Sequence, residues 1–446
     1  MQVTETSAAG LKREYHVVVP ATDLEARVNV RLDEMKDRVQ LRGFRPGKVP
    51  VAHLKRLYGK SAMAEVIEAA VREVNTKIVA DHGFKLATEP KVVLPEDEGA
   101  VEGVIAGKSD LAYTVQMEIV PPITLADFKS IELERLTAPV TDAEVDQSLQ
   151  TLSEQNRPYL AKAEGAAKGD RVTISFNGTL NGESFEGGSG EDVPITLGSG
   201  QFIPGFEDHL TGIKAGESRT FDVKFPENYP AAAVAGKDAT FAVTAKTVEA
   251  PGEVAMDDAF ATTLGLESLA KLRDALRERI EREHASASRQ KIKRALLDQL
   301  DAHHKFEPPP TLVEEEFNNV WQTIENDLKQ QGRTFADEGT TEEKARADYR
   351  AIAERRVRLG LVLAEIGEKN NIKVSDEQLS QAVVAQARMV PGQEQRVWDY
   401  YRNNPGALAA LRAPIFEDKV VDFLLELATV ADKQVSREEL FKDDEE

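Results

Sequence analysis

No cysteine occurs among the 446 residues of the chain, and this excludes several kinds of site. Disulfide scaffolds, zinc–thiolate sites and cysteine nucleophiles all require the thiol group. The seven histidines are scattered along the chain, and none shows the HExxH-type spacing of a zinc site. We therefore expect no metal centre. The lack of cysteine also fits a reducing compartment.

Long apolar runs and an excess of basic residues are also missing. The longest apolar runs, such as VVVPA at 17–21, are far shorter than the ~18 residues of a membrane span. The N-terminal sequence MQVTETSAAG lacks the basic and apolar regions of a secretory signal, so we expect a cytoplasmic protein with no membrane segment. With 77 acidic and 56 basic residues, the net charge of −21 argues against a general nucleic-acid coat protein.

The chain is long enough for two to four domains, at roughly three times the usual domain length. Residues 1–112 combine strand-like stretches with helical patterns, which predicts an α+β domain. One helical pattern begins at Asp23 and stops at Gly43, and a longer one runs from Ser61 to about Gly83. Glycine suits both ends because it tolerates the left-handed conformation in which many helices end.

A connector at 113–150 follows, with a helix start at Thr141. Residues 151–250 have a different pattern, with clustered strand signals and frequent glycine. The dipeptide Asn181-Gly182 lies between two strand-like runs, which is a strong signal for a two-residue hairpin. This region is therefore predicted to be a compact, mostly antiparallel β domain.

Residues 251–446 are predicted to be almost entirely helical. His303 and His304 are interpreted as exposed residues at a helix end rather than as metal ligands. The second helix carries an apolar stripe at steps of three and four residues, formed by Val313, Phe317, Val320, Ile324 and Leu328. The predicted helices span 267–303, 311–331, 341–370, 375–389 and 406–430.

The most unusual local feature is the string GFRPGKVP at 43–50, between the two helical patterns of the first domain. Residues 36–60 contain eight basic residues against Asp37 alone, a local charge of +7. Such a patch attracts an anionic partner, and arginine can bind phosphate through two hydrogen bonds. An exposed Phe44 side chain at a loop tip is unfavourable in water unless it packs against a binding partner. The alternative interpretation is that this segment is a turn between two helices, with its basic side chains facing solvent and no binding role.

This string resembles the ribosome-docking signature of the trigger factor family, a GFRxGxxP-type loop between two helices. The resemblance implies that the loop contacts the large ribosomal subunit near the exit tunnel. The residues that it assigns to ribosome binding are Gly43, Phe44, Arg45, Pro46, Gly47 and Lys48.

The central β region is rich in aromatic residues, although only 6% of the whole chain is aromatic. Its stretches DRVTISFNGTLNGESFEGG and PITLGSGQFIPGFEDHL resemble the FKBP-type prolyl isomerase domain of the same family. Phe206 stands where small FKBPs usually have tryptophan, and Glu186 where they have aspartate. The alternative interpretation for any single aromatic residue is that it only packs in the core of the β domain. The resemblance assigns the catalytic pocket to Phe176, Phe185, Glu186, Phe202, Ile203, Phe206, Tyr229 and Phe241.

Prolyl isomerisation needs no nucleophile, metal or cofactor, and we expect no cofactor here. The barrier of about 18–20 kcal/mol arises because amide resonance is lost as the bond twists. An apolar pocket removes water from the prolyl amide and can bind the twisted form better than either planar isomer. A tyrosine hydroxyl or a backbone N–H that donates to the carbonyl would add to this effect.

The helical region resembles the family's C-terminal chaperone domain by position and composition alone. We therefore predict a multidomain α+β protein that is an ATP-independent chaperone and a prolyl isomerase. The resemblance implies binding to the ribosome and to nascent and unfolded polypeptides, and it is compatible with a weak homodimer off the ribosome. Two alternatives stay open: a plain isomerase with helical dimerisation segments, and a periplasmic chaperone of similar helical build.

The predicted domains follow the order of that family. They are an N-terminal α+β ribosome-docking domain (1–112), a linker (113–150), a central FKBP-like antiparallel β domain (151–250) and an all-α C-terminal chaperone domain (251–446).

Overall fold

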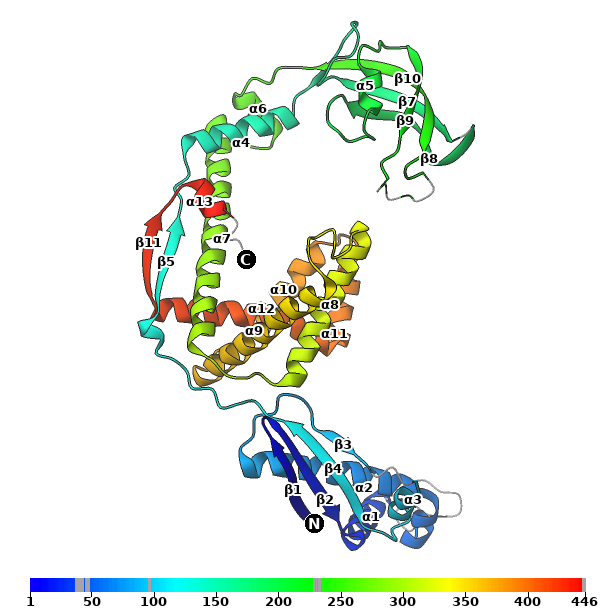
Figure 1. Cartoon of the computed structure of the whole chain (residues 1–446), viewed down its shortest axis with the longest axis vertical. Helices are drawn as coiled ribbons and strands as arrows, with labels where there is room; N and C mark the ends of the chain where they lie inside the picture. The colour runs from blue at the N-terminus through cyan, green and yellow to red at the C-terminus, as the bar shows by residue number, and fades with distance from the viewer. Residues whose placement is uncertain are drawn as a thin grey trace. The chain divides into compact units, whose positions relative to one another are not determined.

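The computed structural model divides the chain into two compact units (Figure 1). One unit combines Met1–Leu133 with Lys293–Val430, and the other combines Glu134–Ile292 with Ala431–Glu446. Both units are discontinuous in sequence, so the residue ranges of the four predicted parts remain predictions. The structure describes residues 1–36, 44, 49–94, 98–180, 182–227, 229, 231 and 234–442. Within those ranges, no helix combines the length and the apolar composition that crossing a membrane requires.

A four-stranded antiparallel sheet forms one layer of the N-terminal region, in the order β1-β2-β4-β3. Tyr15, Val17 and Val19 of β2 are buried on one face, because successive side chains of a strand point to opposite faces. The sequence does not predict β1, since all of its residues are exposed and the apolar alternation is missing. The strands are β1 Gln2–Ala9, β2 Lys12–Val19, β3 Lys91–Val93 and β4 Leu111–Glu118.

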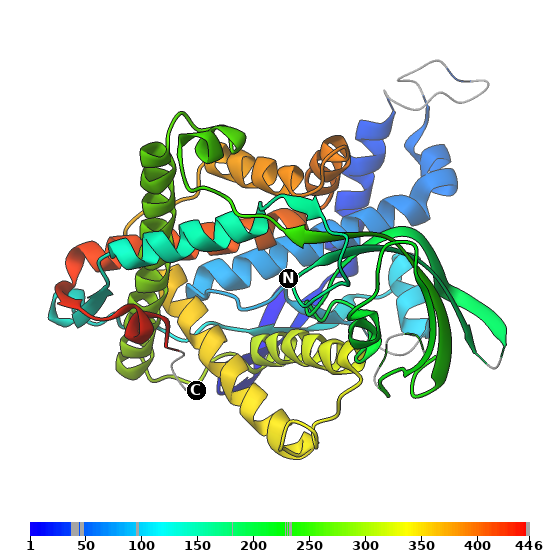
Figure 2. The same cartoon turned by 90° about the horizontal axis from the view of Figure 1, so that it is seen from above.

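Two helices, α1 (Ala21–Met35) and α2 (Val51–His82), share a core with this sheet and lie side by side (Figure 2). The apolar face of α1 is buried at Leu24, Val28 and Leu32. Ion pairs between exposed side chains also join the two helices, as between Arg27 and Glu73 at 2.6 Å. The short helix α3 (Glu98–Ile105) precedes β4.

The extent of α2 differs from the prediction. The sequence indicates a helix start at Pro50 and a longer helix from Ser61, whereas the structure has one continuous helix from Val51 onward with Pro50 as its N-cap. Leu54 is fully buried in the added segment, and its packing compensates for Gly59, which costs a helix interior about 1 kcal/mol. The helix ends at Gly83 with φ 64°, as predicted. The predicted end of the first helix at Gly43 lies outside the described residues.

The central region contains a five-stranded antiparallel sheet. Its strands follow the order β6-β10-β7-β8, and β9 pairs with β10. The predicted hairpin joins β7 to β8, where Leu180 pairs with Glu183. The short helix α5 (Phe206–Leu210) shares the core of this sheet. The strands are β6 Tyr159–Ala161, β7 Arg171–Leu180, β8 Glu183–Thr196, β9 Ser218–Lys224 and β10 Asp238–Pro251.

Shorter elements connect these regions. The helix α4 (Asp142–Gln155) starts after Thr141, as predicted, and Thr141 and Glu144 form a reciprocal capping box. The strand β11 (Thr429–Gln434) pairs with β5 (Glu132–Thr137), a two-stranded sheet that the sequence pattern does not indicate. The remaining short elements are η1 Phe128–Ser130, α6 Asp258–Thr263 and α13 Arg437–Phe441.

Every helix that the sequence predicts after residue 251 is present. The predicted helices do not include α11, in which no residue is buried. The helices are α7 Leu269–His303, α8 Pro310–Gln331, α9 Glu342–Lys369, α10 Asp376–Arg388, α11 Glu394–Asn403 and α12 Pro405–Leu427.

The apolar stripe predicted along α8 is only partly correct. Val313 and Phe317 are buried, but Trp321 is buried where the pattern indicates Val320. The Trp321 ring stacks on Phe317, with centroids 5.8 Å apart, and on Phe335, at 5.1 Å. A large aromatic side chain with ring partners gains more from burial than valine does, and this decides which residue faces inward.

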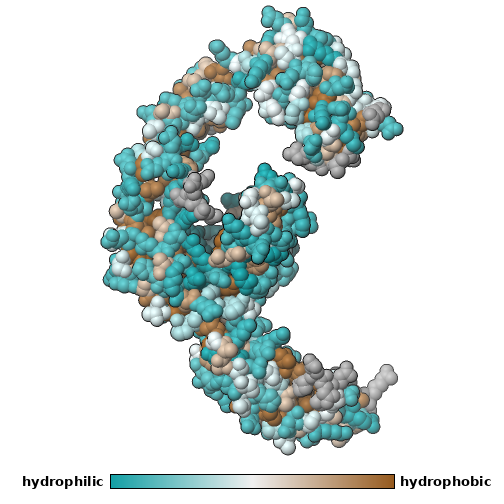
Figure 3. All heavy atoms as spheres, in the orientation of Figure 1, coloured by the Kyte–Doolittle hydropathy of each residue, from teal (hydrophilic) through white to brown (hydrophobic). Residues whose placement is uncertain are grey.

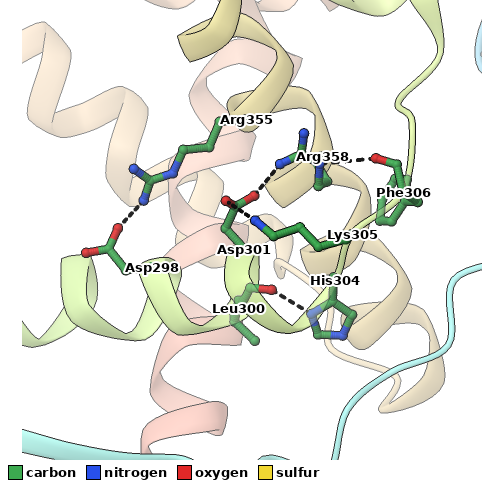
Figure 4. Close-up of polar contacts among 8 residues, drawn as sticks. All are labelled: Asp298, Leu300, Asp301, His304, Lys305, Phe306, Arg355 and Arg358. Carbon is green, nitrogen blue, oxygen red and sulfur yellow. Dashed lines mark hydrogen bonds and ion pairs between the residues drawn. The ribbon is translucent and has the colours of Figure 1, made fainter.

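Charged side chains join the end of α7 to α9 (Figure 4). The Arg358 guanidinium donates to the Asp301 carboxylate at 2.6 Å, and Lys305 donates to the same carboxylate at 3.1 Å. Arg355 pairs with Asp298. Burial raises the pKa of Asp301, but the hydrogen bonds from Arg358 and Lys305 outweigh it and hold the pKa below its usual value.

His304, at the end of the same helix, is not exposed as the sequence suggests. Only 4% of the residue is exposed. Its Nδ1 lies 2.7 Å from the Leu300 carbonyl oxygen, and its Nε2 accepts a hydrogen bond from the Ala126 amide at 3.2 Å. The connector segment that carries Ala126 therefore covers this residue, and both ring nitrogens have a structural role.

Candidate functional site

An apolar pocket of about 400 Å³ lies in the central β region. Among its described lining residues, Gln201 and Tyr229 have the only polar side chains, and none is charged at neutral pH. The pocket is therefore suited to an apolar ring. Its lining consists of Phe176, Phe185, Gly187, Gln201, Phe202, Ile203, Phe206, Phe225, Pro226, Tyr229, Ala231, Val234 and Phe241.

Phe206, the first residue of α5, lies at the centre of the aromatic contacts and is 1% exposed. Its ring stacks on Phe202, with centroids 5.2 Å apart, and meets Phe241 edge to face at 5.2 Å. Phe176 meets it edge to face at 6.3 Å. Such stacked and edge-to-face pairs are favourable, so the rings fix one another in place.

A second group of rings forms the outer part of the pocket. Phe225, which directly follows β9, lies 5.9 Å from Phe185 and 4.8 Å from Tyr229 between ring centroids. Tyr229 is 38% exposed. Its hydroxyl is therefore accessible to a bound peptide, unlike the buried floor at Phe206.

Two glycines allow the pocket rings to lie close to the strand backbone. A Cβ at Gly178 would lie 2.6 Å from Cε1 of Phe241, and a Cβ at Gly190 would lie 2.7 Å from Cε1 of Phe176. Both distances are shorter than real Cβ contacts. A glycine inside a strand often marks a close approach of this kind, and here the approach sets the positions of two aromatic rings.

The structure brings together most of the residues that the sequence assigns to the pocket. Those in the lining are Phe176, Phe185, Phe202, Ile203, Phe206, Tyr229 and Phe241. The side chain of Glu186 lies outside the described residues. The individual catalytic roles remain predictions. The sequence reasoning missed Phe225, although its place between a strand pattern and Pro226 is a signal that could have found it.

The arrangement supports non-covalent chemistry. An uncharged, water-poor cavity removes solvent from a bound amide and so weakens the charge separation that keeps the amide planar. Across the part of the chain that the structure describes, no group of three or more histidine, aspartate or glutamate side chains is arranged to hold a metal ion.

Of the residues predicted to bind the ribosome, the structure describes Phe44. Its side chain is exposed, and its ring lies 5.2 Å from His53. An exposed aromatic ring next to a basic segment fits a docking role. The predicted residues that lie outside the described ranges are Gly43, Arg45, Pro46, Gly47 and Lys48.

The positive charge around Phe44 is partly neutralised within the N-terminal region. Lys55 of α2 donates to Glu25 of α1 at 2.6 Å, and Lys36 pairs with Asp33. The local charge of +7 therefore overstates the charge available to a partner. Ion pairs of this exposed kind are weak, and a polyanion can compete with them.

Several apolar side chains are also exposed along α10, α11 and the turn between these two helices, which pack on each other. We call these residues the α10–α11 surface: Val384, Met389, Val390, Trp398 and Tyr400. Met389 is 76% exposed. On the face that Figure 3 shows, hydrophobic residues of the helical region lie scattered among hydrophilic ones. Exposed methionine and aromatic side chains of this kind are available for contact with a polypeptide.

Family models match the three regions in order. Residues 1–152 match the model described as bacterial trigger factor protein, and residues 268–426 match the model of the trigger factor C-terminus. Between them, residues 162–246 match the FKBP-type peptidyl-prolyl cis-trans isomerase model. The β region that carries the pocket is therefore similar to an established isomerase family.

Curated relatives match the chain over its whole length. A trigger factor of Azorhizobium caulinodans is 62% identical over 446 residues, which is 100% of this chain and 99% of the relative. Trigger factors of Afipia carboxidovorans and Xanthobacter autotrophicus are each 59% identical with the same coverage. A solved trigger factor chaperone structure, 20% identical, aligns with a TM-score of 0.54 over 96% of this chain and 99% of its own, which supports the fold.

Proposed function

This chain belongs to the trigger factor family, the ribosome-associated chaperones that carry an FKBP-type prolyl isomerase domain, and we propose how its parts divide that work. The loop at 43–50 docks on the large ribosomal subunit beside the exit tunnel. The pocket isomerises X-Pro bonds. The helical region holds nascent and unfolded polypeptides without ATP. Docking on the ribosome places the chain in the cytoplasm.

The observation that carries the isomerase assignment is the uncharged aromatic pocket around Phe206. The proline ring packs on the Phe206 floor, and its amide is held away from water. The pocket then binds the twisted amide better than either planar isomer, which lowers the barrier of about 18–20 kcal/mol. The hydroxyl of Tyr229, at the rim of the pocket, donates a hydrogen bond to a carbonyl oxygen of the bound peptide.

Holding a client requires a different surface. The α10–α11 surface exposes aliphatic and aromatic side chains that an unfolded chain can contact through its own apolar residues. Methionine is unbranched and flexible, so Met389 can fit partners of many shapes. Uncatalysed prolyl isomerisation takes tens of seconds, which gives a physical reason for joining an isomerase to a chaperone.

The docking assignment rests on the string GFRPGKVP within a basic segment, together with the exposed ring of Phe44. Ribosomal RNA offers phosphates to the basic residues and stacked bases to the aromatic ring. Contacts of this kind release counterions, so the affinity falls steeply as salt is raised.

Ribosome co-sedimentation over a series of salt concentrations tests docking. A variant with Phe44, Arg45 and Lys48 replaced by alanine should no longer co-sediment at any salt concentration at which the wild type binds. Arg72→Ala with Lys77→Ala is the matched control, because it removes the same charge from α2 outside the loop. Salt-insensitive binding, or equal loss of binding in both variants, would contradict the assignment. A wild type that does not co-sediment at any salt concentration would favour a plain isomerase.

A further inference from the structure

Glu207, the second residue of α5, is a buried carboxylate that lies beside the pocket rather than in its lining. Only 9% of the residue is exposed. It directly follows Phe206, the floor of the pocket, so its backbone and the floor belong to the same helical turn. A buried charge needs hydrogen-bond partners that replace the water it has lost, and the partners of Glu207 identify its role.

The Glu207 carboxylate accepts four hydrogen bonds from the segment that precedes α5. Oε2 accepts from the Gly198 amide at 2.6 Å and from the Gly200 amide at 3.3 Å. Oε1 accepts from the Ser199 hydroxyl at 3.2 Å and from the Phe202 amide at 3.4 Å. Each carboxylate oxygen therefore accepts two hydrogen bonds, and the donors extend from residue 198 to residue 202.

This segment continues into the wall of the pocket. Gln201, Phe202 and Ile203 all line it. Gly198 and Gly200 adopt φ of +87° and +71°, a left-handed backbone that regular secondary structure does not hold in place. The Ser199 amide also donates to the Thr196 carbonyl at 3.2 Å, and the Gln201 amide donates to the Ser199 hydroxyl at 3.4 Å. The four hydrogen bonds to Glu207 outnumber these two and join the segment to α5.

We propose that Glu207 is a positioning residue for prolyl isomerisation, whose carboxylate fixes the 198–202 segment so that Phe202 stacks on Phe206 and closes one wall of the pocket. The inference rests on the proposed function, since it assigns the residue a role in that reaction. Glu207 does not touch the substrate. It acts through Phe202, whose amide it binds and whose ring lies 5.2 Å from the Phe206 ring.

The carboxylate remains charged at neutral pH. Burial raises the pKa of Glu207, but the hydrogen bonds from the amides of Gly200, Gly198 and Phe202 and from the Ser199 hydroxyl outweigh it and lower the pKa below its usual value. Hydrogen bonds to a charged acceptor are roughly twice as strong as neutral ones, which suits a residue that restrains a backbone without regular secondary structure.

Glutamine cannot replace this carboxylate, because its amide has only one acceptor oxygen. On the Gly198 and Gly200 side, its NH2 group would face two backbone N–H donors. On the other side, the Ser199 hydroxyl can turn to accept from the NH2 group, but the Phe202 amide loses its acceptor. Glu207→Gln therefore keeps the size of the side chain and removes the restraint.

The test compares the full-length wild type with Glu207→Gln on an X-Pro peptide, well below the unfolding temperature of each protein. We expect kcat/KM to fall roughly tenfold, and amide hydrogen exchange at residues 198, 200 and 202 to accelerate at least tenfold. The matched control is Glu217→Gln. Glu217 accepts from the Lys214 amide at 3.0 Å in the same domain but does not line the pocket, so its loss should leave kcat/KM within twofold.

A double-mutant cycle with Phe202→Ala separates positioning from general stability. If Glu207 acts through Phe202, adding Glu207→Gln to Phe202→Ala should lower kcat/KM by less than twofold further. If Glu207→Gln does not fold, Ser199→Ala removes one donor from an exposed residue, and it should lower kcat/KM two- to threefold.

The outcomes are distinguishable. A folded wild type that does not isomerise the peptide would overturn the proposed function itself. An active wild type with an equally active Glu207→Gln, or an unchanged Ser199→Ala where the first variant does not fold, would overturn the inference alone. A full tenfold loss in the Phe202→Ala background would also overturn it, because Glu207 would then act by another route.

Discussion

The isomerase pocket and the α10–α11 surface both present apolar side chains to a polypeptide, but they hold those side chains in opposite ways. Phe206 is almost fully buried and contacts the rings of Phe176, Phe202, Phe221 and Phe241. Met389 is largely exposed. Rings that fix one another offer a single shape, whereas flexible exposed side chains can adapt to many partners. Catalysis at one bond and binding of many clients thus require opposite degrees of packing.

The largest expected effect is that of Phe206→Ala on catalysis. Removing the floor should lower kcat/KM on an X-Pro peptide at least tenfold, which corresponds to about 1.4 kcal/mol of transition-state stabilisation. Truncating a buried phenylalanine also costs about 3–5 kcal/mol of folding stability, so circular dichroism must confirm that the preparation is folded. An unchanged rate in a folded protein would remove Phe206 from the pocket. Ribosome co-sedimentation should be unaffected.

The next largest effect is expected for substitutions on the α10–α11 surface. Replacing Met389, Trp398 and Tyr400 with serine removes apolar contacts to an unfolded client. The concentration of the variant that suppresses client aggregation should therefore be severalfold higher than that of the wild type. Val30→Ser with Leu160→Ser is the control, since both residues are similarly exposed elsewhere. Equal loss of protection in the control would show that exposed apolar area in general, rather than this surface, binds clients.

A smaller effect is expected from Gly178→Ala, which tests whether the pocket depends on one fixed ring arrangement. The added Cβ would lie 2.6 Å from Cε1 of Phe241, so the ring must move into the cavity. We expect kcat/KM to fall about three- to fivefold, with client protection unchanged. Gly360→Ala is a useful comparison, because a Cβ there meets no atom within 4 Å and the residue does not have a left-handed backbone. A normal rate in Gly178→Ala would mean that the rings adapt.

Tyr229→Phe should have a still smaller effect on catalysis. The substitution keeps the ring that packs on Phe225 and removes only the hydroxyl. A single hydrogen bond at an exposed rim contributes little, so we expect kcat/KM to change by less than about threefold. A loss as large as that of Phe206→Ala would show that the tyrosine hydroxyl, and not the apolar floor, dominates the catalysis.

The smallest effect is on the pH dependence of stability in the helical region. The pKa of Asp301 is lowered in the folded protein, so its contribution to stability is present above its ordinary pKa of about 3.9 and is lost as the pH falls below it. Asp301→Asn should therefore lower the thermal midpoint at pH 7 but flatten its decline towards pH 3. Parallel melting curves for the two proteins across this range would contradict the assignment.

The two regions also differ in how much the sequence predicts. In the pocket, aromatic residues such as Phe176 and Phe206 lie in local motifs that resemble a known family, and the structure places them together. Phe225 and Glu207 were missed for different reasons. Phe225 looks like an ordinary end of a strand. The role of Glu207 depends on four hydrogen bonds made by a loop, and no periodic pattern encodes a loop conformation.

In the helical region, the sequence predicts the positions of the helices better than it predicts which side chains pack together. Periodicity locates long helices because one face of each must be buried, but it cannot decide which residue of a stripe faces inward. Trp321 is buried next to the half-buried Val320 because its ring also stacks on Phe335, which lies outside α8. His304 is buried because the connector at Ala126 covers it, and such long-range contacts leave no local signal. The α11 helix, with 10 residues and none of them buried, was also missed.

The most direct test of this division of labour measures peptide isomerisation and suppression of client aggregation on the same folded preparations of the full-length chain. The wild type, Phe206→Ala and the triple serine variant of the α10–α11 surface are compared side by side. The account predicts a crossed result: Phe206→Ala loses isomerisation and keeps client protection, and the triple variant does the reverse. A parallel loss of both activities in either variant would contradict it.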